Sequence, residues 1–264
     1  MWYRLHQAMH QPGDPSTETP AKYKLTYETR SFKTEDGVSL KGWYIPVKNP
    51  KAVVITIHGY VDTKATIVDH TKYLHDGGYS TFFIDLRSDN KKTKYTLGVD
   101  ESKDIEAAYD YMKSLPENSN KKVGFFSGSM GAATSIVTAG KSGKGDFVIA
   151  TVPYANFKRL FAQQLHNEKL PSFLLPFLRI AALLEFGISY YKFTPSNYIS
   201  NIHKPIFIMS AKYDEVVNGD DAKYLFDLAN EPKRFWQAST HHRIFNEIPE
   251  EFAKRVINFL NTVT

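Results

Sequence analysis

Apolar residues recur along the chain in short runs that have the composition of strands. The runs are rich in Val, Ile, Phe and Tyr, and Gly, Pro, Asn or Asp residues bound most of them. Strands are therefore expected at residues 23–34, 38–47, 52–58, 79–85, 122–127, 147–152, 205–210 and 233–238.

Between these runs the apolar spacing changes to that of a helix. One apolar stripe runs from Ile105 to Met112 and another from Phe252 to Leu260. Strands that alternate with helices after an initial hairpin predict an α/β fold, with a mostly parallel sheet, an antiparallel N-terminal hairpin and helices on both faces. At 264 residues the chain is expected to form one domain, over residues 1–264.

The stretch 154–201 interrupts this alternation, because it is far longer than one crossover helix. Within it Pro176, Arg179 and Glu185 break an apolar segment before it reaches the ~20 residues that span a bilayer, so no integral membrane span is expected. We interpret 154–201 as a helical lid inserted into the domain.

The lid has apolar residues on most of its sides, too many for one stripe facing a core. Phe173, Phe177 and Leu184 are therefore expected to line an apolar substrate pocket beneath it. The alternative is that these side chains only add to the core, as most apolar stripes do.

The segment KKVGFFSGSMGAA, residues 121–133, is typical of a nucleophile elbow. Ser129 would stand at the tip of a sharp turn from strand to helix, exposed to substrate. Gly128 and Gly131 fit the strained backbone and close approach that such a turn requires. Ser127 occupies the first position of the usual G-x-S-x-G pattern, which weakens the signal, and an ordinary Gly/Ser loop is the alternative.

A serine nucleophile needs a base and an orienting carboxylate, and both follow it in the chain. Asp214 comes after the expected strand at 205–210, and the pair His241 and His242 follows the strand at 233–238. The order serine, acid, histidine with each residue after a strand is that of the α/β hydrolases.

The chain resembles the serine esterases and lipase-like enzymes of the α/β-hydrolase superfamily over nearly its whole length. The hairpin at 32–46, the His-Gly turn at 58–59 and the strand at 78–87 resemble the first strands of that fold. Three supporting turns depart from the family pattern, after the strand at 78–87, before Asp214 and before the histidines.

The resemblance implies roles for particular residues. Ser129 would be the nucleophile and Asp214 the acid, and the backbone N–H groups of Tyr60 and Met130 would form the oxyanion hole. Phe245 and Pro249 stand four and eight residues after His241, at the family's spacings, so His241 is favoured as the base over His242.

Composition adds little to the choice among classes of function. The net charge of +5 arises from scattered lysines, so nucleic-acid binding is not expected. The chain has no cysteine, which excludes disulfides and thiolate metal sites, and its histidines show no metal-ligand spacing. No metal or other cofactor is expected. The first 14 residues lack the apolar core of a signal peptide, so a cytoplasmic location is expected.

We expect a serine carboxylesterase that acts on small esters with short to medium apolar acyl groups or with aryl groups. The same triad also serves thioesterases, amidases, peptidases and carbon–carbon hydrolases, which are the alternatives. A non-catalytic binding protein is a further alternative, because of the three departures from pattern.

Overall fold

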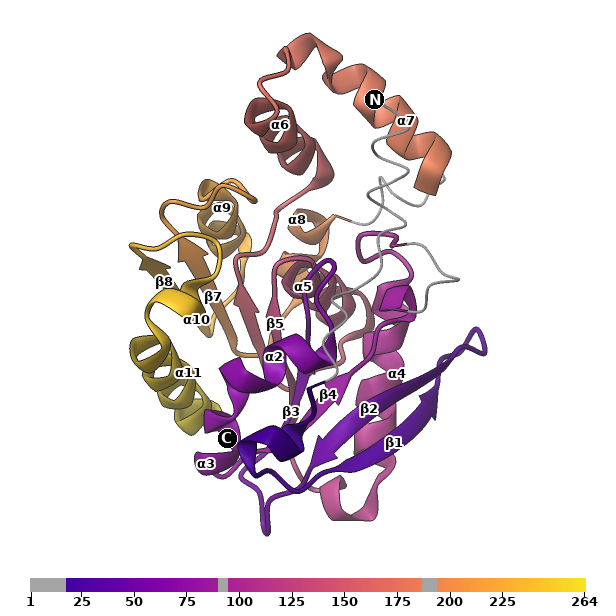
Figure 1. The fold of residues 1–264 in the computed structure, drawn as a ribbon, viewed down its shortest axis with the longest axis vertical. Coiled ribbons are helices and arrows are strands. Elements are labelled where there is room, and N and C mark those ends of the chain that lie inside the picture. The colour runs from indigo at the N-terminus through magenta and orange to yellow at the C-terminus, as the bar shows by residue number, and fades with distance from the viewer. Residues whose placement is uncertain (1–17, 90–94, 187–193) are drawn as a thin grey trace.

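A central sheet of eight strands organises the computed structural model, which describes residues 18–89, 95–186 and 194–264 (Figure 1). The strands are β1 (Glu28–Lys33), β2 (Ser39–Ile45), β3 (Val53–Ile57), β4 (Ser80–Ile84), β5 (Val123–Gly128), β6 (Val148–Thr151), β7 (Ile206–Ala211) and β8 (Lys233–Ala238). Their order in the sheet is β1-β2-β4-β3-β5-β6-β7-β8.

The N-terminal hairpin is antiparallel and the rest of the sheet is parallel, as the sequence predicts. β2 pairs with β1 and β4 in antiparallel fashion, and every pair from β4–β3 to β7–β8 is parallel. The first strand is shorter than expected, because Pro20–Tyr23 form a 3₁₀ turn and β1 begins only at Glu28. Lys24, with φ of 60°, ends that turn in the left-handed region.

Helices connect the strands and cover both faces of the sheet (Figure 1). They are α2 (Lys64–Thr71), α3 (Tyr73–Asp76), α4 (Glu101–Ser114), α5 (Met130–Ser142), α6 (Phe157–Asn167), α7 (Leu175–Phe186), α8 (Pro195–Tyr198), α9 (Asp220–Leu228), α10 (Ile244–Glu247) and α11 (Pro249–Val263). Further 3₁₀ turns are η2 (Arg87–Asp89), η3 (Pro116–Asn118), η4 (Ser172–Leu174) and η6 (Ile199–Asn201).

Alternate residues of each central strand enter different cores. In β3, Val53 and Ile55 pack on the side of α4, α5 and α9, whereas Val54 packs on the side of α11. All five residues of β3 are buried, as expected for a strand covered on both faces. The two stripes identified in the sequence, in α4 and α11, supply the helical side of these cores.

Helices α6 and α7 lie at one end of the molecule, away from the hairpin (Figure 1). Phe161 and Leu165 of α6 pack with Leu178 and Ala182 of α7 in a small core that also includes Ala133 of α5. Within the described residues, no helix is both long and apolar enough to cross a bilayer.

Candidate active site

Ser129 stands between β5 and α5, at the centre of the sheet. Its backbone angles, φ 53° and ψ −120°, lie in a region that residues other than glycine rarely adopt. The N–H of Ser129 donates to the Thr151 carbonyl of β6 at 2.8 Å, which anchors the strained residue. The sequence therefore forms the sharp strand-to-helix turn that was predicted around Ser129.

The small residues around Ser129 have different structural roles. A side chain at Gly131 would meet the His58 carbonyl oxygen at 2.5 Å, so α5 approaches β3 too closely for any other residue. A Cβ at Gly128 would meet nothing within 4 Å, so the prediction of a close approach at Gly128 is wrong. Ser127 is buried, and its hydroxyl donates to the Ile149 carbonyl, a bond that glycine would lack.

Asp214 and His242 form a close pair beside this turn. The ring nitrogen Nδ1 of His242 lies 2.8 Å from Oδ2 of Asp214, and the two side chains are 14% and 2% exposed. The carboxylate also accepts the N–H groups of Val216 and Val217, both at 2.9 Å. The loops that carry the pair are joined because Tyr213 donates its N–H to the Thr240 carbonyl at 3.0 Å.

The structure places His242, and not His241, against Asp214, which corrects the choice made from the sequence. His241 is 65% exposed, and its N–H and ring both face Glu247 at the end of α10. The chain bends at residues 239, 240 and 242, after the end of β8, and only one of the two histidines faces Asp214. The contact with Glu247, which spacing alone did not indicate, decides which one.

Ser129 and His242 line one cavity of about 270 Å³ at the carboxyl ends of β3, β5 and β6. It extends between α2 on one side and α10 with α11 on the other. Most of its wall is apolar, with side chains of Ile57, Val61, Ile67, Phe126, Val152, Val216, Phe245 and Phe252.

The three side chains of residues 154–201 that were expected to line the pocket do not line this cavity. Phe173, Phe177 and Leu184 are 70%, 61% and 76% exposed on the outer side of η4 and α7. The side of α7 that packs inward uses Leu178 and Ala182 against α6 instead. An apolar pattern all round a helix does not identify the side that meets a ligand, which is why the expectation failed.

The wall also contains polar groups that the sequence analysis missed. Nη2 of Arg243 lies 3.2 Å from Oδ1 of Asp62, so an ion pair joins the loop after β3 to the loop after β8. The ring of His70 packs on Phe245 at 3.9 Å between centroids, and burial lowers the pKa of His70. Their positions in the sequence could have indicated these groups. Asp62 lies three residues after the His-Gly turn, and Arg243 directly follows the paired histidines.

Of the two residues expected to supply oxyanion donors, one lines this cavity and the other directly follows Ser129 in the chain. Tyr60 lines it directly after the His-Gly turn, and its ring packs against Tyr95 at 4.9 Å between centroids. Met130 is the first residue of α5, where backbone N–H groups have no partner within the helix.

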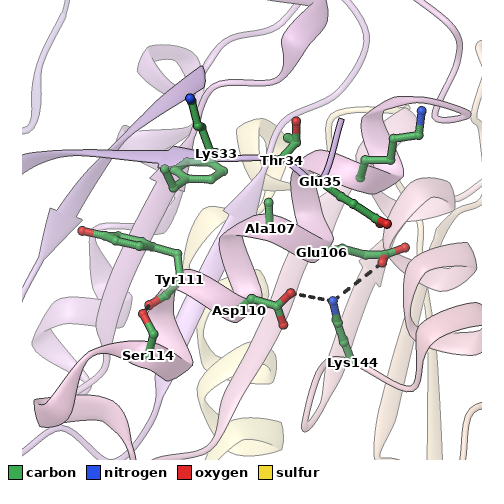
Figure 2. A pocket seen from close by; sticks show the side chains of 11 residues that line it. Lys33, Thr34, Glu35, Glu106, Ala107, Asp110, Tyr111, Ser114 and Lys144 are labelled. Carbon is green, nitrogen blue, oxygen red and sulfur yellow. Dashed lines mark hydrogen bonds and ion pairs between the residues drawn. The ribbon is translucent and has the colours of Figure 1, made fainter. Parts of the chain in front are cut away.

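A larger hollow of about 460 Å³ lies between β1 and α4 (Figure 2). Lys144 there pairs with Asp110 at 2.7 Å and with Glu106 at 3.7 Å, as the dashed lines show (Figure 2). These charges satisfy one another, and the hollow contains no histidine beside a nucleophile. The cavity at Ser129, although smaller, is therefore the candidate active site.

Three comparisons with known proteins identify the family and the fold of the chain. The family model described as serine aminopeptidase, S33, matches residues 48–187. The uncharacterized protein YqkD of Bacillus subtilis is 27% identical over 240 residues, which are 86% of this chain and 77% of that protein.

Two solved structures illustrate the likeness of fold. The Pyrococcus furiosus esterase Pf2001 superposes with a TM-score of 0.78 at 25% identity, over 95% of this chain and 96% of that one. Dipeptidyl peptidase 4 of Porphyromonas gingivalis superposes with a TM-score of 0.70 at 20% identity, over 90% of this chain and 35% of that one.

Proposed function

Because the chain belongs to the serine aminopeptidase S33 family of α/β hydrolases, we propose that it is a serine hydrolase that cleaves carboxylic esters through an acyl-enzyme on Ser129. The meeting of Ser129 with the Asp214–His242 pair at one apolar cavity carries the proposal. The Pyrococcus furiosus esterase, which is similar over nearly the full length of both chains, supports ester hydrolysis.

The proton path follows from the hydrogen bonds of His242. Because Nδ1 donates a hydrogen bond to Asp214, the lone pair of the neutral ring is on Nε2, which can accept the Ser129 proton. The Ser129 oxygen then attacks the ester carbonyl, and the imidazolium returns the proton to the leaving alcohol. Water, deprotonated by His242 in the same way, attacks the acyl-enzyme and releases the carboxylic acid and Ser129.

The negative oxygen of each tetrahedral intermediate would be held by backbone N–H groups of Tyr60 and Met130. Met130 opens α5, so the positive end of the helix dipole adds to the attraction. One such donor contributes about 10²–10³-fold to kcat in serine hydrolases.

The cavity between α2 and α10 would receive the apolar part of the substrate. Its volume of about 270 Å³ is just below the range of roughly 300–1,000 Å³ usual for ligand pockets, which favours short acyl groups or a single aromatic ring. Each buried methylene contributes ~0.8 kcal/mol, or about fourfold in kcat/KM, until the cavity is full.

Labelling with phenylmethylsulfonyl fluoride tests the nucleophile. Intact-mass analysis of the wild-type protein is expected to show one adduct and loss of p-nitrophenyl acetate turnover. Ser129→Ala should take up no label and show turnover lower by at least about 10³-fold. Ser135→Ala, which alters a serine within α5, is the matched control and should label normally. A labelled Ser129→Ala protein would refute the proposal.

Peptide or amide hydrolysis is the second candidate, favoured by the family's description as serine aminopeptidases. The same triad would serve it, with an amine as leaving group. A p-nitrophenyl ester and the p-nitroanilide of the same acyl group separate the two candidates. We expect the ester to be the better substrate, and a larger kcat/KM for aminoacyl anilides would reverse the assignment.

A further inference from the structure

His58 is a buried residue that directly follows β3 and lies next to the proposed oxyanion turn, and both of its ring nitrogens have acceptors. Nδ1 lies 2.9 Å from the Gly59 carbonyl oxygen, and Nε2 lies 3.0 Å from Oδ2 of Asp89. A carbonyl oxygen only accepts, so Nδ1 must carry a proton. Neither nitrogen is available to take the proton of Ser129.

The surroundings hold His58 in place and favour its cationic form. Asp89 follows β4, in η2, and Oδ2 also accepts the Leu86 N–H at 2.8 Å, which fixes the carboxylate. Burial by itself lowers the pKa of His58, but the charge of Asp89 and the hydrogen bonds to Asp89 and Gly59 raise it to about 9.

The hydrogen bond between His58 and the Gly59 carbonyl also orients the N–H group of the same peptide. The Gly59 carbonyl and the Tyr60 N–H belong to one planar unit, which is trans because the only cis bond among the described residues precedes Pro232. In a trans peptide the C=O and N–H point in opposite directions. Fixing the carbonyl toward His58 therefore turns the Tyr60 N–H away from it.

The turn that carries this peptide lines the candidate active site. Gly59 and Tyr60 both line the cavity, and a Cβ built on Gly59 would lie 3.3 Å from Cβ of Ser129. A peptide rotated by a small angle would move the N–H off the position of the oxyanion, where hydrogen bonds weaken steeply with misalignment.

We propose that His58, held by Asp89, is a positioning residue that locks the Gly59–Tyr60 peptide so that the Tyr60 N–H faces the oxyanion. The proposal rests on acyl transfer at Ser129. His58 touches no reacting atom and acts through the turn, so its loss is expected to affect the tetrahedral state more than substrate binding.

Two amide substitutions at His58 separate this role from a merely structural one. In His58→Asn the side-chain nitrogen takes the place of Nδ1 and keeps a donor for the Gly59 carbonyl. In His58→Gln it takes the place of Nε2, so the link to Asp89 is kept and the bond to Gly59 is lost. Both variants remove the same charge, and each is the control for the other.

The expected result is an asymmetry between the variants on p-nitrophenyl acetate. His58→Asn should keep kcat within about threefold, whereas His58→Gln should lose about 10- to 100-fold in kcat with KM within twofold. The inhibition constant of phenylboronic acid, whose serine adduct is a tetrahedral anion, should rise with the loss in kcat. Equal losses in both variants, or wild-type kcat in His58→Gln, would overturn the proposal.

A measurement on the wild-type protein covers the case in which His58→Gln does not fold. On binding phenylboronic acid, the Tyr60 amide proton should move downfield in a ¹H–¹⁵N spectrum, because it then donates to the boronate oxygen. An unmoved Tyr60 resonance would refute the positioning role. Turnover that survives in Ser129→Ala would instead refute acyl transfer at Ser129, so the two failures are distinguishable.

Discussion

Ser129 stores backbone strain at the site where the chemistry is proposed. Non-glycine residues with such angles cost about 1–3 kcal/mol and persist only where the surroundings enforce them. In this protein the bond to Thr151 and the close packing of Gly131 on β3 do so. The strain aims the hydroxyl into the cavity at the expense of stability.

Glycine and alanine at position 129 should differ in stability although both lack the hydroxyl. We expect the free energy of unfolding to be ~1 kcal/mol higher for Ser129→Gly than for Ser129→Ala, because glycine adopts φ of 53° without a clash. Urea denaturation of the two variants measures this difference. Equal stability would show that residue 129 is not strained.

The adjacent histidines should differ sharply in their effect on turnover. His242→Ala is expected to lower kcat by about 10³-fold or more, because it removes the partner of Asp214. His241→Ala should change kcat less than threefold, since that side chain is 65% exposed and contacts Glu247. Turnover of p-nitrophenyl acetate by both variants tests the assignment, and the reverse order would restore His241 as the base.

At the scale of elements, α2 and α10 rather than α7 bound the cavity. Phe245 of α10 packs against His70 of α2 and closes the space between these helices. Phe177 of α7 is 61% exposed and lies outside the cavity wall. The acyl preference should therefore depend on α10 and not on α7.

Substitutions in the two helices test this assignment with the same change. Phe245→Ala is expected to enlarge the cavity and shift the best p-nitrophenyl ester to an acyl chain longer by two or more carbons, because roughly the volume of a phenyl ring is freed. Phe177→Ala should leave the profile of kcat/KM against chain length unchanged. A profile altered only by Phe177→Ala would restore a pocket beneath the lid.

At the scale of the molecule, the parallel sheet brings distant residues to one edge. His58 follows β3, Ser129 follows β5, Asp214 follows β7 and His242 follows β8, and the carboxyl ends of parallel strands share an edge. The arrangement of the site therefore depends on the packing of the whole sheet, including that of α11 on the face opposite α4.

Removing a core side chain far from the cavity should affect folding alone. Phe259 of α11 is 2% exposed, packs on Phe207 of β7 at 5.4 Å between centroids and does not line the cavity. Phe259→Ala should lower the free energy of unfolding by about 3–5 kcal/mol, measured by urea denaturation, with kcat per folded molecule unchanged. A reduced kcat in the folded protein would couple α11 packing to the site.

Much of the architecture follows from local patterns that the sequence contains. Runs of Val, Ile, Phe and Tyr located all eight strands, of which β3, β4, β6 and β7 are buried along their whole length. Gly131 predicts the elbow because it permits the close approach of α5 to β3. Asp214 could be chosen because it follows a strand and stands between the serine and the histidines.

Other features depended on contacts between segments far apart in the chain. Glu247 selects which histidine faces Asp214, the packing of α6 leaves one side of α7 exposed, and His70 meets Phe245 across 175 residues. The sequence by itself determined the strands, the elbow and the residue types of the site, because these are set by neighbours within a few positions. Only the tertiary structure decided the register of the histidine loop and the location of the cavity, since both depend on which surfaces pack together.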